Sequence, residues 1–234
     1  MRQCPERATR VAYGATLDEA VKGGELMPIE IEIGFKIPGA SIKERLLNDV
    51  TVLAAKTYER RSFTMAAEYY DTPSQALSKI GVTLRRRMEN SEPFISVKAV
   101  VPNGRRILVR NTWECPGFEI SAAIGTLVDM GAPRELLELA GSEGYVTRGR
   151  YEYTRESIPI LIDDETSAKV NFDEGVILTE NKQKDFSEVL FTLLFGDRDK
   201  LEEFAFSFEE KYGLTRELSS KYDRALRLIR SRPL

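Results

Sequence analysis

Arginines recur in pairs, two residues apart, in separate parts of the sequence. Arg85 and Arg87 lie in the segment GVTLRRRM, and Arg148 and Arg150 lie in the segment TRGRY. In a β-strand such pairs share one face, because alternate side chains point to the same side. The guanidinium group is a planar fork of N–H donors that matches the oxygens of phosphate. Repeated pairs are therefore what a binding site for a polyphosphate would require.

Other segments with strand-like alternation also collect their charge on one side. In IEIEIGFK (29–36), Glu30, Glu32 and Lys36 lie opposite the isoleucines. The same parity sets further charged residues apart from apolar neighbours, namely Lys98 in FISVKAV, Arg110 and Glu114 in VRNTWE, and Asp173 in AKVNFDEG. Each of these segments therefore has one charged face and one apolar face.

Two architectures account for this one-sided charge. In the first, every polar face is the solvated side of an antiparallel sheet. In the second, the strands close into a barrel whose charged faces point inward and whose apolar faces are covered by helices. A charged interior is costly unless water and a highly charged ligand occupy it. The recurring arginine pairs, which are unusual on a solvated face, favour the second architecture.

Strand-like segments outnumber helical ones. Strands are expected around 29–36, 65–71, 81–88, 94–101, 106–114, 145–153, 158–163, 168–173 and 186–195, and helices at 38–57, 133–140, 197–212 and 216–230. Because strands and helices do not alternate regularly, the pattern predicts an antiparallel α+β architecture rather than a doubly wound sheet.

Residues 1–26 show no clear periodicity, whereas strand patterns begin directly after Met27. We therefore expect 1–26 to be an N-terminal extension and 27–234 to form a single domain. The segment KGGELM is also what a purine-rich ribosome-binding site would encode if it were translated. One hypothesis is thus that Met27 is the biological start and that the extension is not native.

Composition limits the class of protein. Of 234 residues, 42% are hydrophobic and 30% are charged, which is ordinary for a folded soluble domain. The net charge of −3 gives no bulk field toward duplex nucleic acid or an anionic membrane. Two cysteines, Cys4 and Cys115, are too few for a disulfide framework. No apolar run reaches the length of a membrane span, so we expect a soluble cytoplasmic protein.

The sequence contains no histidine. This removes the commonest general base, the Ser–His and Cys–His nucleophile pairs, and imidazole ligands for zinc. If the protein is an enzyme, carboxylates, lysines, arginines or a metal-bound water must carry the chemistry.

Several segments together resemble the CYTH domains, the family of triphosphate tunnel metalloenzymes. EIEIGFK (30–36) resembles the Glu-x-Glu-x-Lys signature that opens these domains. YYDTPSQALSKIGVTLRRRMEN (69–90) closely resembles the family's Tyr-Tyr-Asp-Thr-Pro segment with its following arginine strand. Further matches are FISVK, VRNTWE, TRGRY, VNFDEG and the late SSKYDRAL, all in family order. The layout is most similar to that of the bacterial inorganic triphosphatase branch.

The resemblance implies a closed eight-stranded antiparallel β-barrel, with helices packed outside, that binds a triphosphate together with Mg2+ or Mn2+. It implies metal ligands at Glu30, Glu32 and Glu188, and catalytic roles for Glu30, Glu32 and Lys36. The implied phosphate-binding residues are Arg85, Arg87, Lys98, Arg110, Arg148, Arg150 and Lys221, with Glu114 and Asp173 as supporting acids. Family members hydrolyse inorganic triphosphate, thiamine triphosphate or RNA 5′-triphosphates, and one branch cyclises ATP.

The chain departs from the family pattern at four positions. Gly34 stands where the signature has its lysine, and Lys36 lies on the same face about 7 Å further along the strand. Leu190 and Thr192 stand where the family commonly alternates glutamates, and Thr112 replaces another frequent glutamate. The chain therefore retains more of the cationic residues of the family pattern than of its carboxylates.

Two functions stay open for such a chain. The first is metal-dependent hydrolysis of a triphosphate, either inorganic or joined to an organic group, inside the tunnel. The second is a catalytically impaired tunnel that binds polyphosphate or a nucleotide as a sensor or sequestering module, and a class IV-type adenylate cyclase is a further alternative. We expect a small triphosphate partner or an RNA 5′-triphosphate end, with no membrane and no duplex nucleic acid.

Overall fold

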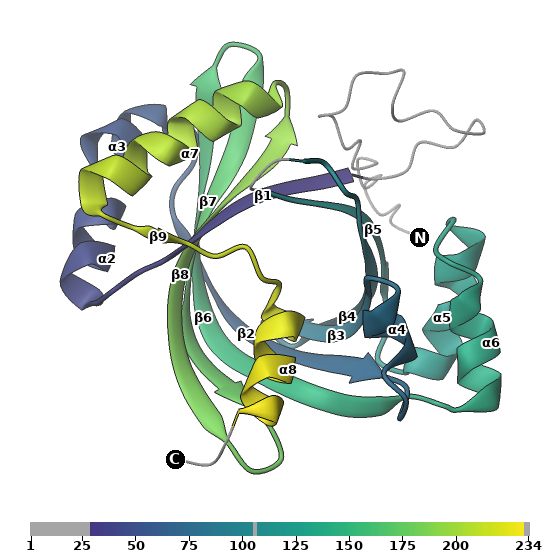
Figure 1. Ribbon diagram of the computed structural model, residues 1–234. Coiled ribbons are helices and arrows are strands. Elements are labelled where there is room, and N and C mark those ends of the chain that lie inside the picture. Colours follow the sequence, from purple (N-terminus) through teal and green to yellow (C-terminus); the bar gives the residue numbers. More distant parts are fainter. Residues whose placement is uncertain (1–28, 105–106, 232–234) are drawn as a thin grey trace, which may run out of the picture.

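Eight antiparallel strands close into a barrel in the computed structural model, which describes residues 29–104 and 107–231 (Figure 1). The strands are β1 (Ile29–Lys36), β2 (Arg61–Asp71), β3 (Val82–Glu89), β4 (Glu92–Val100), β5 (Leu108–Pro116), β6 (Val146–Asp163), β7 (Thr166–Leu178) and β8 (Gln183–Phe195). Their order is β5-β4-β3-β2-β6-β7-β8-β1, and β1 closes the ring by pairing with β5. The predicted closed eight-stranded barrel is therefore confirmed.

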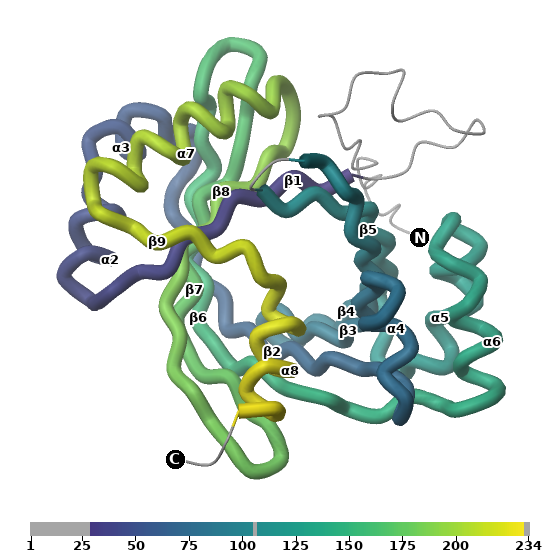
Figure 2. Tube along the Cα trace, in the orientation of Figure 1, coloured from purple at the N-terminus to yellow at the C-terminus, as the bar shows by residue number. Residues whose placement is uncertain are grey.

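The first strand joins the two halves of the barrel. Glu30 pairs with Arg110 of β5, while Glu32 pairs with Thr192 of β8. A short strand, β9 (Thr215–Arg216), continues the sheet beside the end of β1. Figure 2 shows the long strands β6, β7 and β8 running along the barrel wall, with their turns at opposite ends.

Helices cover the barrel on two sides and at one opening. They are α2 (Ala40–Leu47), α3 (Val50–Ala55), α4 (Ala76–Lys79), α5 (Ile120–Asp129), α6 (Glu135–Ser142), α7 (Arg198–Tyr212) and α8 (Lys221–Arg230). Figure 1 shows α2, α3 and α7 together on one side of the barrel and α5 and α6 on the other. The last helix, α8, lies at the opening that faces the viewer.

Two hydrophobic clusters lie between the outside of the barrel and the helices. One joins outward residues of β1 and β8, such as Ile33 and Phe191, to α2, α3 and α7. The other joins outward residues of β3 to β5, such as Leu84 and Val97, to α5 and α6. This arrangement confirms that the apolar strand faces are covered by helices, and it leaves the charged faces pointing inward.

A third cluster lies inside the barrel, where the sequence predicted only charge. It consists of Met65, Ala67, Tyr69, Tyr151, Tyr153, Ile177, Tyr222, Ala225 and Leu226. The rings of Tyr69 on β2 and Tyr222 on α8 are stacked, with centroids 5.6 Å apart. The apolar face of α8 thus fills one part of the barrel interior.

The structure differs from the predicted elements in several places. The helix expected at 216–230 begins only at Lys221, and the short helix α4 was not expected. β6 runs unbroken from Val146 to Asp163, where two strands were expected. Pro159 does not interrupt the strand, because the pairing of β6 with β2 ends at Ser157. On that edge no backbone N–H is needed from residue 159, so a proline is tolerated there. The helix expected over 38–57 is divided into α2 and α3, since Asp49 caps the second helix. The helix α5 was not expected, because Gly125 and Thr126 are weak helix formers.

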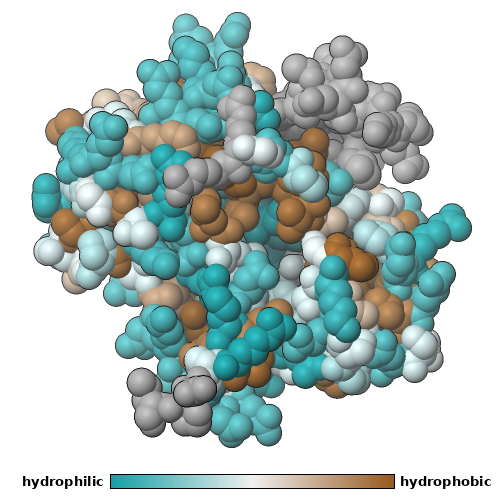
Figure 3. All heavy atoms as spheres, in the orientation of Figure 1, coloured by the Kyte–Doolittle hydropathy of each residue, from teal (hydrophilic) through white to brown (hydrophobic). Residues whose placement is uncertain are grey.

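The proposed extension at 1–26 lies outside the described residues, so the domain boundary at Met27 stays a prediction. Within the residues that the structure describes, no helix is long and apolar enough to cross a membrane. On the face shown in Figure 3, hydrophobic residues gather near the middle, and hydrophilic ones surround them.

The buried carboxylate of Asp49 links α3 to α7, and it supplies a test of the fold. It accepts a hydrogen bond from the backbone N–H of Thr51 at 2.8 Å and one from the hydroxyl of Tyr212, and it lies 2.6 Å from the ammonium of Lys211. Burial alone would raise the pKa of Asp49, but these partners lower it to about 2. Its contribution to stability is therefore complete above about pH 4 and is lost as the pH falls toward 2.

We predict that Asp49→Asn lowers the free energy of unfolding by about 2 kcal/mol at pH 7 and by clearly less near pH 2. Urea unfolding at both pH values measures the difference. The exposed Asp129, changed to Asn, is the control and leaves the free energy unchanged. Equal stability of the wild type and Asp49→Asn at pH 7 would contradict the prediction.

Candidate functional site

A cavity of about 510 Å³ occupies the barrel interior beside the third hydrophobic cluster, which contains Tyr69 and Tyr153. The charged side chains that line it are Glu30, Glu32, Arg85, Arg87, Glu89, Lys98, Arg110, Glu114, Arg155, Lys169, Glu188, Glu217, Lys221 and Arg224. They come from strands all around the barrel, from α8 and from the segment before α8. The cavity is thus a shared product of the barrel wall and its closing helix.

A first group of cations lies on β3, β4 and β5. Lys98 donates to both oxygens of Glu30, at 2.6 and 2.8 Å. Arg110 contacts Glu30 and donates to Glu32 at 2.8 Å. Each carboxylate of β1 is therefore held by a cation from the neighbouring wall.

The arginine pair of β3 completes this group. Arg87 donates to Glu114 at 3.0 Å, and Arg85 lies 3.6 Å from the same carboxylate. The side chain of Arg85 also donates to Ser96 Oγ at 3.1 Å. The pair lies inside the barrel as predicted, with both guanidinium groups directed to one acid on β5.

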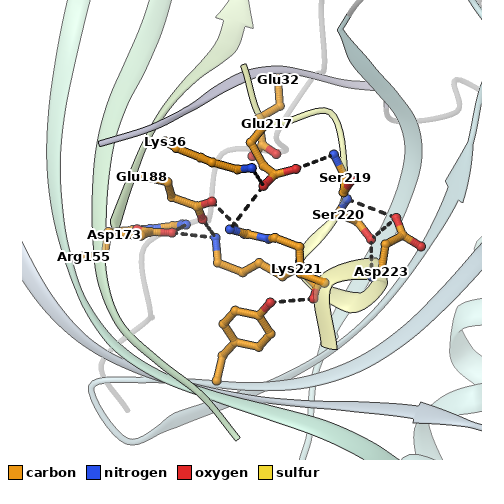
Figure 4. A network of polar contacts seen from close by, with 12 residues as sticks. Glu32, Lys36, Arg155, Asp173, Glu188, Glu217, Ser219, Ser220, Lys221 and Asp223 are labelled. Carbon is orange, nitrogen blue, oxygen red and sulfur yellow. Dashed lines mark hydrogen bonds and ion pairs between the residues drawn. The ribbon is translucent and has the colours of Figure 1, made fainter. Parts of the chain in front are cut away.

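A second group of cations comes from β6 and α8 (Figure 4). Arg155 makes a bidentate contact with Asp173, with both bonds at 2.7 Å. Lys221 donates to Asp173 at 2.8 Å and also to Glu188. Arg224 lies 2.6 Å from Glu188. The closing helix thus supplies two of the cations in this group.

Burial makes these ion pairs mutually dependent. It would raise the pKa of Glu30, but Lys98 and Arg110 hold that pKa well below the usual range. Burial lowers the pKa of Lys98 to about 8, although Glu30 acts in the opposite direction. Burial would likewise raise the pKa of Asp173, which Arg155 and Lys221 keep low. Removing either member of such a pair would leave a buried charge without compensation.

Most of the residues predicted for the site line the cavity, but four do not. Asp173 lies directly behind Arg155 and Lys221, fully buried. The side chain of Lys36 is 57% exposed and is not part of the cavity lining, although its ammonium lies 3.5 Å from Glu217, which does line the cavity.

Neither Arg148 nor Arg150 lines the cavity, which corrects their predicted placement. Arg148 donates to the carbonyl oxygens of Thr72 and Pro73, and Arg150 is 3.0 Å from Glu68. The inward residues of β6 have the opposite parity and include Tyr153 and Arg155 in the cavity wall. The spacing of the two arginines predicts the wrong face of β6, because the aromatic residues Tyr151 and Tyr153 mark the inner one.

Five charged residues of the cavity were missed, namely Glu89, Arg155, Lys169, Glu217 and Arg224. Arg155 is the cross-strand partner of Asp173, whose inward direction was predicted, so parity along β6 could have found it. Arg224 is three residues after Lys221 and therefore lies on the same side of a helix. Glu217 lies in an irregular segment, and no periodic signal marks it.

Two of the departures from the family pattern, at Gly34 and Leu190, occur at the same place in the structure. Gly34 and Leu190 are direct cross-strand partners. A Cβ atom at position 34 would lie 3.0 Å from Leu190 Cδ2. Leu190 therefore occupies the space beside Gly34, so an apolar contact fills the position where the resemblance implies a lysine with an acid opposite.

The predicted metal ligands do not all converge. Glu30 and Glu32 are neighbours on the inner face of β1, and such a pair fits a Mg2+ ion that also binds substrate phosphate. Glu188 pairs with Lys36, whereas Glu32 pairs with Thr192, four residues further along β8. This offset amounts to roughly 13 Å along the strand. No group of three potential metal ligands occurs within the described residues.

The fold is similar to the folds of several solved structures. No family model and no curated protein matches the sequence. HpAC1 from Hippeastrum, described as an adenylyl cyclase candidate with a dominant triphosphatase activity, matches with a TM-score of 0.53 at 13% identity, over 85% of this chain and 95% of that chain. The PH1819 protein of Pyrococcus horikoshii OT3 matches with a TM-score of 0.51 at 18% identity, over 85% of this chain and 98% of that chain.

The chain therefore has the closed tunnel fold of the CYTH-type triphosphatase and cyclase proteins. The resemblance inferred from YYDTP and the arginine strand is confirmed at the level of the fold.

The YYDTP segment holds α8 in the barrel. Asp71 is fully buried and accepts hydrogen bonds from the backbone N–H groups of Thr72, Leu77 and Ser78, at 2.8 to 3.1 Å. The hydroxyl of Tyr222 donates to the same carboxylate at 2.7 Å. Tyr222 follows Lys221 directly, so this contact fixes the helix turn that presents Lys221 to the cavity.

We predict that Tyr222→Phe lowers the free energy of unfolding by about 1 to 3 kcal/mol, because the buried carboxylate of Asp71 loses a donor. Urea unfolding measures the change. Tyr58→Phe is the control, since Tyr58 is 71% exposed. Equal effects of the two substitutions would show that the buried hydrogen bond does not stabilise α8.

Proposed function

We propose that the tunnel binds a triphosphate and hydrolyses a phosphoanhydride bond at its end. The observation that supports this most directly is the presence of two cation groups around one cavity. One consists of Arg85, Arg87, Lys98 and Arg110 on β3 to β5, and the other of Arg155 on β6 with Lys221 and Arg224 on α8. A linear chain of phosphates can contact both groups at once. Phosphate oxygens would then replace carboxylates as the partners of these cations.

Within this proposal the metal is Mg2+ or Mn2+, held by Glu30 and Glu32. When bound, it would neutralise negative charge on the phosphoryl group that is transferred. The cations of β3 to β5 position the phosphates, and Lys221 and Arg224 stabilise the charge at the other end of the chain. The substrate is inorganic triphosphate or an organic triphosphate, since guanidinium groups recognise the phosphates rather than what is attached to them.

We predict release of orthophosphate from inorganic triphosphate, ATP or an RNA 5′-triphosphate in the presence of Mg2+ or Mn2+. A colorimetric phosphate assay, with and without chelator, measures it. Binding without turnover of any of the three substrates would support a sensor or sequestering module instead. Formation of cyclic AMP and diphosphate from ATP would support the cyclase alternative.

The two arginine pairs of the sequence give a matched test of the binding site. We predict that Arg85→Ala weakens triphosphate binding about 10-fold to 100-fold, because a buried charge-assisted contact contributes roughly 1.5 to 3 kcal/mol. Arg150→Ala is the control and leaves affinity unchanged, since Arg150 lies outside the cavity. Isothermal titration calorimetry measures both. An equal loss of affinity in the two variants would contradict the assignment of the inner face.

A further inference from the structure

Hydrolysis requires a group that accepts a proton from the attacking water. Because the chain has no histidine, the carboxylates of the tunnel are the natural candidates. A carboxylate whose oxygens are engaged by short bonds from cations has little freedom to contact a water. The bonds that each acid makes therefore distinguish the candidates.

Five of the tunnel carboxylates are held by short contacts. Glu30 and Glu32 receive bonds from Lys98 or Arg110 at 2.6 to 2.8 Å, and Glu114 receives one from Arg87 at 3.0 Å. Arg155 and Lys221 donate to Asp173 at 2.7 to 2.8 Å. Glu188 lies 2.6 Å from Arg224 and also accepts a bond from Lys221. These acids neutralise the cations.

Glu217 differs from them in both position and bonding. It is only 6% exposed and lines the cavity from the segment between β9 and α8. Its Oε1 accepts one hydrogen bond, from the backbone N–H of Ser219 at 3.0 Å, while its Oε2 is buried with no hydrogen-bond partner. Figure 4 shows this carboxylate beside Lys36 and above the Lys221 and Glu188 contacts.

The cations around Glu217 are more distant than those around the other acids. Oε2 lies 3.5 Å from the ammonium of Lys36 and 4.0 Å from Arg224, and Oε1 lies 3.8 Å from Arg227. Burial would raise the pKa of Glu217, but the Ser219 N–H, Arg224 and Lys36 lower it below the usual value. The carboxylate is therefore ionised at neutral pH, and its Oε2 has ion-pair partners at 3.5 and 4.0 Å but accepts no hydrogen bond.

Gly34 provides the space for this carboxylate. The backbone N–H of Glu217 donates to the carbonyl of Gly34 at 2.8 Å, so the segment lies directly against β1. A Cβ at position 34 would be 3.4 Å from the carbonyl oxygen of Glu217 and 3.9 Å from its Cβ. A long side chain on this strand position would compete with Glu217 for the cavity.

We propose that Glu217 is the general base of the hydrolysis, which rests on the function proposed above. Oε2 accepts a proton from a water molecule as the water oxygen forms a bond to the terminal phosphorus. The bond from that phosphorus to the bridging oxygen breaks, and its electron pair leaves with the diphosphate group. Orthophosphate departs, and the proton on Glu217 passes to solvent. Arg224 lies 2.6 Å from Glu188 and 4.0 Å from Glu217. In this position it can bind the phosphoryl group that the water attacks.

The test separates catalysis from binding. Glu217→Gln keeps the size of the side chain and its hydrogen bond from Ser219 but cannot take the proton. We expect kcat for inorganic triphosphate to fall about 100-fold, within the range for loss of a general base, while the dissociation constant changes less than about 3-fold. Glu217→Asp keeps a carboxylate and is expected to retain more activity than Glu217→Gln.

Glu209→Gln is the matched control, because Glu209 also pairs with an arginine, Arg216, but does not line the cavity. It should retain wild-type kcat. A fall in kcat of less than about tenfold in Glu217→Gln, or a loss of affinity as large as the loss of kcat, would overturn the role of Glu217 and leave the hydrolase proposal standing. Absence of hydrolysis by the unchanged protein would overturn both.

Discussion

Charge compensation inside a closed barrel is the constraint on which the rest of this structure depends. Once eight strands close on themselves, their inward side chains lose most of their contact with water. Each buried cation then needs a carboxylate within reach, and the structure supplies one in Glu30, Glu114, Asp173 or Glu188. The interior is therefore a set of ion pairs that a polyanion can rearrange, because phosphate oxygens can take the place of the acids.

The closing helix joins the hydrophobic core to the site. The apolar side of α8 packs Tyr222, Ala225 and Leu226 against β2 and β6, while its first turn directs Lys221 and Arg224 toward Glu188. Ser220 and Asp223 form a capping box that sets where the helix begins. Loss of the helix would thus remove part of the core and two cations of the cavity together.

The pair of Gly34 and Leu190 shows how such an interior can contain fewer charged residues while its net charge stays the same. The two residues face each other across β1 and β8, so a cation and an acid at these positions would be lost as a unit and replaced by an apolar contact. The space that results is used by Glu217, which approaches from a different part of the chain. Beside Gly34, the carboxylate that reaches the cavity therefore comes from the segment before α8.

The sequence by itself grouped Arg85, Arg87, Lys98 and Arg110 on the charged faces of their strands, because alternation fixes which side chains of a strand share a face. Alternation left open whether those faces meet solvent or a barrel interior, and the closed barrel was expected from the resemblance to a family. The sequence could not decide which face of β6 points inward, because Arg150 and Arg155 lie on opposite faces of the strand and each face therefore carries an arginine. Only the register of β6 against β2 and β7 determines that the face with Arg155 points inward. Nor could the sequence place Glu217 over Gly34, because that contact joins residues far apart in the chain through an irregular segment. Local periodicity carries information along one strand, whereas closure of the barrel and docking of α8 decide which strands and segments meet.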